Sequence, residues 1–176
     1  GWAKLALPDA PFAEGGFPTP SGKALADAPG YGVPDHVPNY ETLGQSAPYP
    51  LAMISPPARN FLNSTFVNVA SLQKQEGRPL VEIHPQDAAA RGIADGSVVR
   101  VFNDRGNYVC HAVLTDRARP GVVNGLGIWW RKLGLAGTNV NQLTSQALTD
   151  MGQAPTFSDC LVEVEAATAE SITINK

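Results

Sequence analysis

A loop of hydrogen-bonding side chains follows the strand that the pattern predicts at residues 49–54. Its sequence, SPPARNFLNST, offers groups that bind a phosphate or a heterocycle: Ser55, Arg59, Asn60, Asn63, Ser64 and Thr65. Arg59 carries the only full charge in this loop, and the fork of a guanidinium group suits phosphate oxygens. The loop is therefore the first candidate for a binding site.

A second polar loop covers Gly137–Thr144, with sequence GTNVNQLT. Asn139 and Asn141 each present an amide donor and an amide acceptor side by side, as the edge of a base or a pterin requires. Residue types and spacing leave two alternatives open at this point. The loops either form binding sites or are two ordinary polar turns.

Outside these loops, the residues form no complete catalytic site. The three histidines lack metal-ligand spacing, and His84 directly before Pro85 indicates a structural role at the start of a helix. Neither a Gly-x-Ser-x-Gly elbow nor a dinucleotide-binding glycine fingerprint is present. Cys110 and Cys160 are too few for a disulfide framework and are expected to be buried small hydrophobic residues. We predict neither catalytic residues nor a metal site in this chain.

Composition limits the possible partners. The chain has 176 residues with a formal net charge of −3, which excludes a general nucleic-acid binder because such a protein carries a basic patch. No apolar run approaches the roughly 18 residues of a membrane span, and no signal-peptide pattern opens the chain. The chain begins Gly1-Trp2, and only 16% of its residues are charged, as on a surface buried against sister domains. We therefore expect a piece of a larger protein.

The first 48 residues differ in composition from the rest. Residues 1–50 hold nine of the fifteen prolines. Proline fixes φ and removes a backbone donor, so neither a regular helix nor a central strand fits there. We predict an extended Pro/Gly-rich arm over residues 1–48, whose apolar side chains favour docking over a disordered leader, and a second domain over residues 49–170.

Short apolar runs separated by tight turns predict a β-rich second domain. Strands are expected at residues 49–54, 80–83, 97–102, 107–114, 122–123 and 160–164. Pro85 and Gly92 bracket a short helix. A weaker, more polar segment between Asn141 and Met151 is a candidate for another short helix. Several short strands with few helical residues indicate an all-β barrel or sandwich.

Seven short motifs occur along the chain in a specific order. They are FPTPSGK (17–23), FLNSTF (61–66), VEIHPQDAAARGIADGSVVRVFNDRG (81–106), PGVV (120–123), WW (129–130), VNQLT (140–144) and PTFSD (155–159). Together they resemble the C-terminal domain of the molybdopterin oxidoreductases of the dimethyl sulfoxide reductase class, from about Phe17 to Val164. The resemblance implies a six-stranded double-psi β-barrel, which agrees with the all-β interpretation.

The resemblance also implies a molybdopterin dinucleotide-binding domain that closes over a bis(molybdopterin guanine dinucleotide) cofactor with molybdenum or tungsten. From the two loops and the resemblance together, the predicted cofactor-binding residues are Ser55, Arg59, Asn63, Ser64, Thr65, Asn139, Asn141, Phe157 and Ser158. Many members of this class carry a histidine at the position of Asn63, and some carry a lysine at the position of Ser158. Neither residue here supplies that charge.

The same resemblance implies an oxidoreductase whose metal ligand lies in an earlier domain, so the chain alone is expected to be redox-inert. Its expected partners are the remaining domains of that oxidoreductase and an iron–sulfur electron-transfer subunit. The sequence does not choose between cytoplasm and periplasm. An alternative from another functional class is a free-standing double-psi barrel that acts as a protein-interaction module, which the apolar, proline-rich arm would also fit.

Overall fold

The computed structural model describes most of the chain, namely residues 3–4, 10–26, 30, 32, 35, 41–44, 47–150 and 152–172. The chain divides into two compact units, Gly1–Val37 and Pro38–Lys176. In the first unit the described residues form turns, and the rings of Phe12 and Phe17 stack with their centroids 4.6 Å apart. All of the described strands lie in the second unit.

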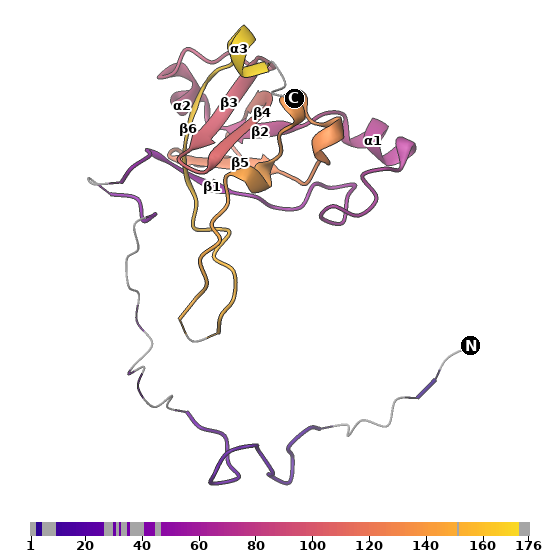
Figure 1. Ribbon diagram of the computed structural model, residues 1–176, viewed down its shortest axis with the longest axis vertical. Coiled ribbons are helices and arrows are strands. Elements are labelled where there is room, and N and C mark those ends of the chain that lie inside the picture. The colour runs from indigo at the N-terminus through magenta and orange to yellow at the C-terminus, as the bar shows by residue number, and fades with distance from the viewer. Residues whose placement is uncertain are drawn as a thin grey trace. The chain divides into compact units, whose positions relative to one another are not determined.

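Six strands close a barrel in the second unit (Figure 1). In chain order they are β1 (Leu51–Ile54), β2 (Leu80–Ile83), β3 (Val98–Asn103), β4 (Gly106–Leu114), β5 (Val122–Leu126) and β6 (Leu161–Ala166). Their order around the barrel is β1-β5-β2-β4-β3-β6. The pairs β1–β5 and β2–β4 are parallel, and the other contacts are antiparallel. The barrel confirms the predicted all-β class, and its two parallel pairs agree with the double-psi arrangement.

Residues of β3 alternate between the inside and the outside of the barrel. In β3, Val99, Val101 and Asn103 are buried, while the residues between them are partly exposed. This period of two places one face of each strand in the core and the other toward the surface. Tyr108, from β4, is among the largest fully buried side chains. The core therefore fills the interior of the barrel, and any binding site must lie at its ends or in its loops.

Helices in the described residues are short. They are α1 (Ala70–Glu76), α2 (Pro85–Ala89) and α3 (Ala169–Ile172), with 3-10 turns η1 (Arg131–Leu133), η2 (Leu135–Gly137) and η3 (Val140–Gln142). The predicted helix after His84 is confirmed as α2. The Nδ1 atom of His84 accepts a hydrogen bond from the backbone of Gln86 at 3.1 Å, so His84 has the structural role predicted for it. None of these helices has the length and apolar character needed to cross a membrane.

The segment after η3 is a long loop instead of the expected helix (Figure 1). It leaves the barrel and returns to β6, and a bridge joins Leu148 to Pro155 across it. The backbone of Thr149 donates to the carbonyl of Ala154 at 2.8 Å, so the hydrogen bonds run across the loop and not along a helix. The helix predicted between Asn141 and Met151 is therefore wrong for the described residues beyond Gln142. We call residues 146–150 and 152–158 the finger loop.

Candidate functional site

A pocket of about 520 Å³ lies at the end of the barrel where the parallel strands β1 and β5 finish. Its lining comes from the barrel rim and the finger loop and comprises Ser55, Asn63, Ile128, Asn141, Thr144, Ser145, Gln146, Leu148, Pro155 and Phe157. None of these lining residues is charged. The volume lies within the range typical of small-molecule and cofactor sites, roughly 300–1,000 Å³.

Four of the predicted residues meet in this pocket although they are far apart in the sequence. Ser55 directly follows β1, Asn63 lies in the next loop, Asn141 lies in η3 and Phe157 belongs to the finger loop. Their common position is a property of the barrel, because β1, β5 and η3 bring their loops to one end. The two polar loops are therefore not independent surface turns.

Asn141 offers a free amide to this pocket. Its residue is exposed, and its side chain makes no hydrogen bond with any residue that the structure describes. The backbone is fixed, because its N–H donates to Asn139 Oδ1 at 3.2 Å and its carbonyl accepts from Thr144 Oγ1 at 3.2 Å. A held backbone with an unengaged amide is suited to read a polar ligand edge.

Asn139 has a different role from Asn141. Its Oδ1 atom caps η3, its Nδ2 atom donates to the carbonyl of Trp129 at 3.3 Å, and its backbone N–H donates to Gln142 Oε1 at 3.0 Å. This is a capping box, in which cap and third residue satisfy each other's backbone donors. The Asn139 amide is therefore engaged within the protein and holds η3 in place.

The loop that carries Asn63 is held by a turn and by a small apolar cluster. Leu62 and Thr65 exchange backbone hydrogen bonds of 3.2 and 2.9 Å, and Asn63 between them adopts a φ of 51°, a left-handed conformation that asparagine tolerates better than most residues. Phe61 packs edge-on against Trp129, with ring centroids 5.0 Å apart. The position of Asn63 therefore depends on the contact between this loop and the chain after β5.

The other predicted residues do not line the pocket. These are Arg59, Ser64, Thr65 and Ser158, all exposed, together with Asn139. Ser64 contributes its carbonyl to the loop by accepting a 2.8 Å hydrogen bond from Trp130 Nε1. For all five, direct contact with a cofactor stays a prediction.

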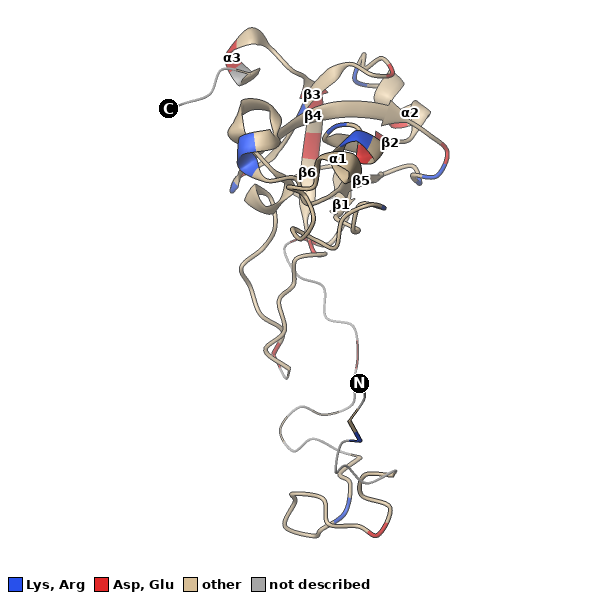
Figure 2. Ribbon diagram, turned by 90° about the vertical axis from the view of Figure 1, so that its right-hand side faces the viewer, with Lys and Arg blue, Asp and Glu red and all other residues tan. Residues whose placement is uncertain are grey.

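Sequence reasoning did not single out six of the lining residues: Ile128, Thr144, Ser145, Gln146, Leu148 and Pro155. Thr144 is the last residue of the VNQLT motif and Pro155 is the first residue of the PTFSD motif, so the motifs could have indicated both. Gln146 and Leu148 reach the pocket because the finger loop folds back on itself, Ile128 lies just after β5, and Ser145 lies between η3 and the finger loop. No local sequence pattern predicts these positions. Figure 2 shows few charges on this loop, in keeping with Asp150 as the only acidic or basic residue among those described.

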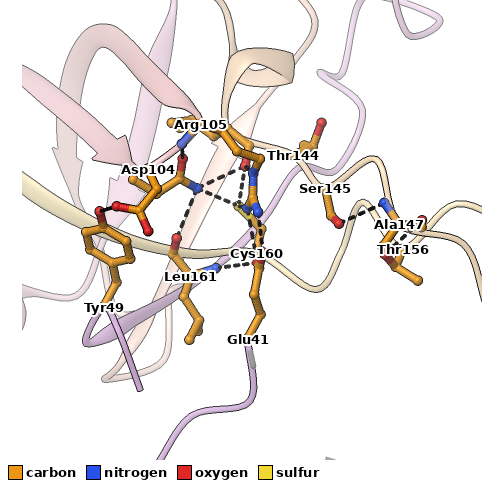
Figure 3. Close-up of polar contacts among 12 residues, drawn as sticks. Glu41, Tyr49, Asp104, Arg105, Thr144, Ser145, Ala147, Thr156, Cys160 and Leu161 are labelled. Atoms are coloured by element: carbon orange, nitrogen blue, oxygen red, sulfur yellow. Dashed lines mark hydrogen bonds and ion pairs between the residues drawn. The ribbon is translucent and has the colours of Figure 1, made fainter. Parts of the chain in front are cut away.

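A buried polar network lies beside the pocket (Figure 3). Arg105 forms a two-pronged ion pair with Glu41, whose Oε2 atom also accepts from the backbone N–H of Leu161 at 3.0 Å. The hydrogen bond to Glu41 raises the pKa of Arg105 above its already high value. Glu41 precedes the barrel in sequence and was not predicted to have a role, because its partners lie 64 and 120 residues away.

Cys160 belongs to the same network. Its thiol donates to the carbonyl of Leu143 at 3.2 Å and accepts weak contacts from Asn103 Nδ2 and Arg105, both at 3.7 Å. Burial raises the pKa of the Cys160 thiol to about 11 despite the nearby Arg105. Both cysteines are buried and free, as predicted, but Cys160 is also a hydrogen-bonding residue.

A closed β-barrel with an uncharged, amide-bearing pocket at one end is suited to be a cofactor-binding domain. The chain belongs to the family described as "Molydopterin dinucleotide binding domain", whose model matches residues 51–161. Membership agrees with the resemblance in the motifs and covers all of β1 to β5. The chain is thus a molybdopterin cofactor-binding domain.

Relatives with reductase names are similar over most of the chain. The "Probable oxidoreductase YoaE" of Bacillus subtilis is 37% identical over 88% of this chain, and trimethylamine-N-oxide reductase 1 of Escherichia coli is 39% identical over 73% of it. The biotin sulfoxide reductase of Cereibacter sphaeroides is 37% identical over 72%. The chain spans only 23%, 17% and 18% of the lengths of these three relatives.

One solved structure supports the fold alone. Acetylene hydratase from Pelobacter acetylenicus superposes with a TM-score of 0.60 at 17% identity, over 68% of this chain and 18% of that protein. At this identity the likeness concerns the arrangement of strands and not the reaction.

Proposed function

We propose that the pocket holds the pterin part of a molybdopterin guanine dinucleotide cofactor, and that the whole protein is a molybdenum or tungsten oxidoreductase. One observation carries the proposal. Ser55, Asn63, Asn141 and Phe157, which come from separate parts of the sequence, line a single uncharged pocket in a molybdopterin-binding domain.

The lining suits a neutral, polar heterocycle better than a phosphate. Amides and hydroxyls supply donors and acceptors without a net charge, which matches the edge of a pterin. A phosphate would instead favour an arginine fork or a lysine, and no lining residue is of that kind. Arg59, which is exposed and lies in the same loop as Asn63, is the residue we assign to the phosphates of the dinucleotide.

The cofactor supplies the redox chemistry at its metal, and the protein supplies binding and orientation. Asn141 donates through Nδ2 and accepts through Oδ1, so it fixes which edge of the pterin faces the barrel. Phe157, a residue that is 49% exposed, offers a ring on which a planar heterocycle can stack. The finger loop, with Leu148 and Pro155, shields that heterocycle from water.

The remaining domains of the oxidoreductase are the proposed neighbours of the pocket, which is supported by the much greater length of the relatives. The bis form of the cofactor and an iron–sulfur subunit stay predictions from the resemblance. The family match and the greater length of the relatives favour this proposal over the alternative of a free-standing interaction module.

Asn141→Leu tests the proposal in the whole polypeptide. The change keeps a similar volume and removes both hydrogen-bonding groups, and an unpaired polar group in a closed site costs about 1–3 kcal/mol. We expect affinity for the cofactor to fall by about 5- to 150-fold. The measurement is the pterin content per protein, from the fluorescence of oxidised pterin released on denaturation.

Asn68→Leu is the matched control, because Asn68 is exposed and does not line the pocket. It should retain the pterin content of the unchanged protein. If Asn141→Leu also retains that content, the pocket is not the pterin site.

A further inference from the structure

We propose that Glu41 and Arg105 form a positioning pair that fixes the wall of the pocket bearing Asn141. The importance of this pair for cofactor binding rests on the proposed function. The contacts from which we infer the pair lie within the domain itself. Neither residue lines the pocket, so each acts through the backbone that it holds.

The first link is the ion pair itself. The Glu41 side chain is only 4% exposed, and both of its oxygens are engaged, one by Arg105 Nη1 and the other by Arg105 Nη2 at 3.1 Å and by the Leu161 N–H at 3.0 Å. A two-pronged pair fixes geometry as well as charge. Glu41 therefore holds the guanidinium in one orientation at the start of β6 (Figure 3).

The second link joins the guanidinium to η3. Arg105 Nε donates to the carbonyl of Leu143 at 2.7 Å, and Asn103 Nδ2 donates to the same oxygen at 2.9 Å. Leu143 directly follows η3 and is fully buried. Thr144, next to it, and Asn141, two residues before it, line the pocket. One carbonyl thus connects the turn between β3 and β4 to the pocket wall.

A steric contact fixes the same segment independently. A Cβ atom added to Gly106, the first residue of β4, would lie 3.1 Å from the carbonyl oxygen of Gln142. The hairpin therefore already touches η3 along its backbone, with no room for a side chain. The contact at Gly106 sets how closely η3 approaches the β3–β4 hairpin. The hydrogen bond from Arg105 sets the position of Leu143 along that hairpin.

A second arginine ion pair on the β3–β4 hairpin provides a contrast. Arg100 pairs with Glu165 at 2.9 Å, but their side chains are 31% and 48% exposed and neither residue lines the pocket. Exposed pairs of this kind contribute little to stability. Glu165→Gln is therefore the matched control for Glu41→Gln, because each removes one negative charge from an arginine pair of the same hairpin.

Amide hydrogen exchange on the 176-residue chain tests the pair without any cofactor. Glu41→Gln should speed exchange at the Gln142 and Leu143 amides at least about tenfold relative to Val99 and Val101 of β3, because local opening is separable from global unfolding. Glu165→Gln should leave that ratio unchanged. An unchanged ratio in Glu41→Gln, with or without a loss of overall stability, would overturn the proposal.

A second variant decides the matter if Glu41→Gln does not fold. Arg105→Lys keeps the positive charge but lacks the fork and the Nε donor, so it cannot hold Glu41 and the Leu143 carbonyl together. It should produce the same local rise in exchange at Gln142 and Leu143. Exchange equal to that of the unchanged chain would overturn the proposal.

Pterin content separates this inference from the proposed function. In the whole polypeptide, Glu41→Gln should lower pterin content, as Asn141→Leu does, and Glu165→Gln should not. If Asn141→Leu lowers it and Glu41→Gln does not, the pair does not position the pocket. If neither variant lowers it, the proposed function is wrong, and hydrogen exchange alone decides whether the pair holds η3.

Discussion

Three asparagines around the pocket show how identical side chains acquire different roles. Asn139 has its amide engaged in capping η3, while Asn141, two residues later, has an unengaged amide facing the pocket. Asn63 reaches the pocket from a left-handed turn position. Which asparagine amide is available to a ligand therefore depends on the backbone position of the residue and not on the residue type alone.

The raised pKa of the Cys160 thiol makes the free energy of unfolding depend on pH. Its pKa of about 11 lies above the ordinary value of 9.0, so the folded chain keeps a proton that the unfolded chain releases. This contribution is fully present below pH 9 and is lost as pH rises toward 11. Cys160→Ser keeps a donor for the Leu143 carbonyl but does not ionise there. Urea unfolding from pH 8 to 11 should therefore show a shallower alkaline loss in Cys160→Ser, and identical slopes would contradict this assignment.

The short 3-10 turn η3 packs closely against two glycines of the barrel. A Cβ atom at Gly125 in β5 would lie 3.0 Å from Val140 Cγ2, and one at Gly127 would lie 2.9 Å from Val140 Cγ1. Val140 is fully buried as a result. The absence of side chains at these two positions lets the element that carries Asn141 lie directly against the barrel.

Gly125→Ala should therefore strain the seat of η3. The added methyl group meets both Val140 and Met53 Sδ, the latter at 3.5 Å, and overpacking of this kind costs about 1–3 kcal/mol. Gly152→Ala in the finger loop is the control, because its nearest neighbour, Thr149 Oγ1, is 3.6 Å away. Urea unfolding of both variants checks this. Equal stabilities for the two would mean that η3 can shift at no cost.

The strands were predictable from sequence, and the connections between them were much less so. Short apolar runs and turn residues predict a strand at each of the six observed positions, although β5 continues to Leu126 beyond the predicted Val123, and α2 follows from Pro85 and Gly92. Helix α1 escaped prediction because it buries no side chain and has no side-chain cap. The finger loop and the Glu41 pair escaped because they depend on contacts between distant segments. Asn63 and Asn141 were found through their amides and the resemblance, not through any local signal of a pocket.

At the scale of the whole molecule, the segment before the barrel belongs to the barrel's compact unit. That unit begins at Pro38, and Glu41 within it is buried against Arg105 and β6. Composition places the limit between arm and barrel at residue 48, because the prolines continue to that point, and this limit stays a prediction. Glu41 lies before residue 48 in the sequence, and its carboxylate is nevertheless buried against residues of the barrel. Proline content depends on the local backbone and does not predict such a tertiary contact.

Two shortened chains measure what this segment contributes. A chain that begins at residue 38 keeps Glu41, while one that begins at residue 49 leaves Arg105 without it. The Arg105 side chain is 26% exposed, so the loss of Glu41 removes charge-assisted hydrogen bonds worth about 1.5–3 kcal/mol without leaving a fully buried charge. The chain from 49 should therefore unfold at a lower urea concentration. Similar midpoints for the two chains would show that Glu41 is dispensable for the fold.

An experimental structure of the whole protein loaded with its molybdopterin cofactor tests the assignment of the pocket most directly. We expect the pterin to occupy the pocket at the ends of β1 and β5. There, Nδ2 or Oδ1 of Asn141 should lie within about 3.2 Å of a polar atom of the pterin edge. A pterin bound elsewhere, with the Asn141 amide facing only solvent or protein, would contradict it.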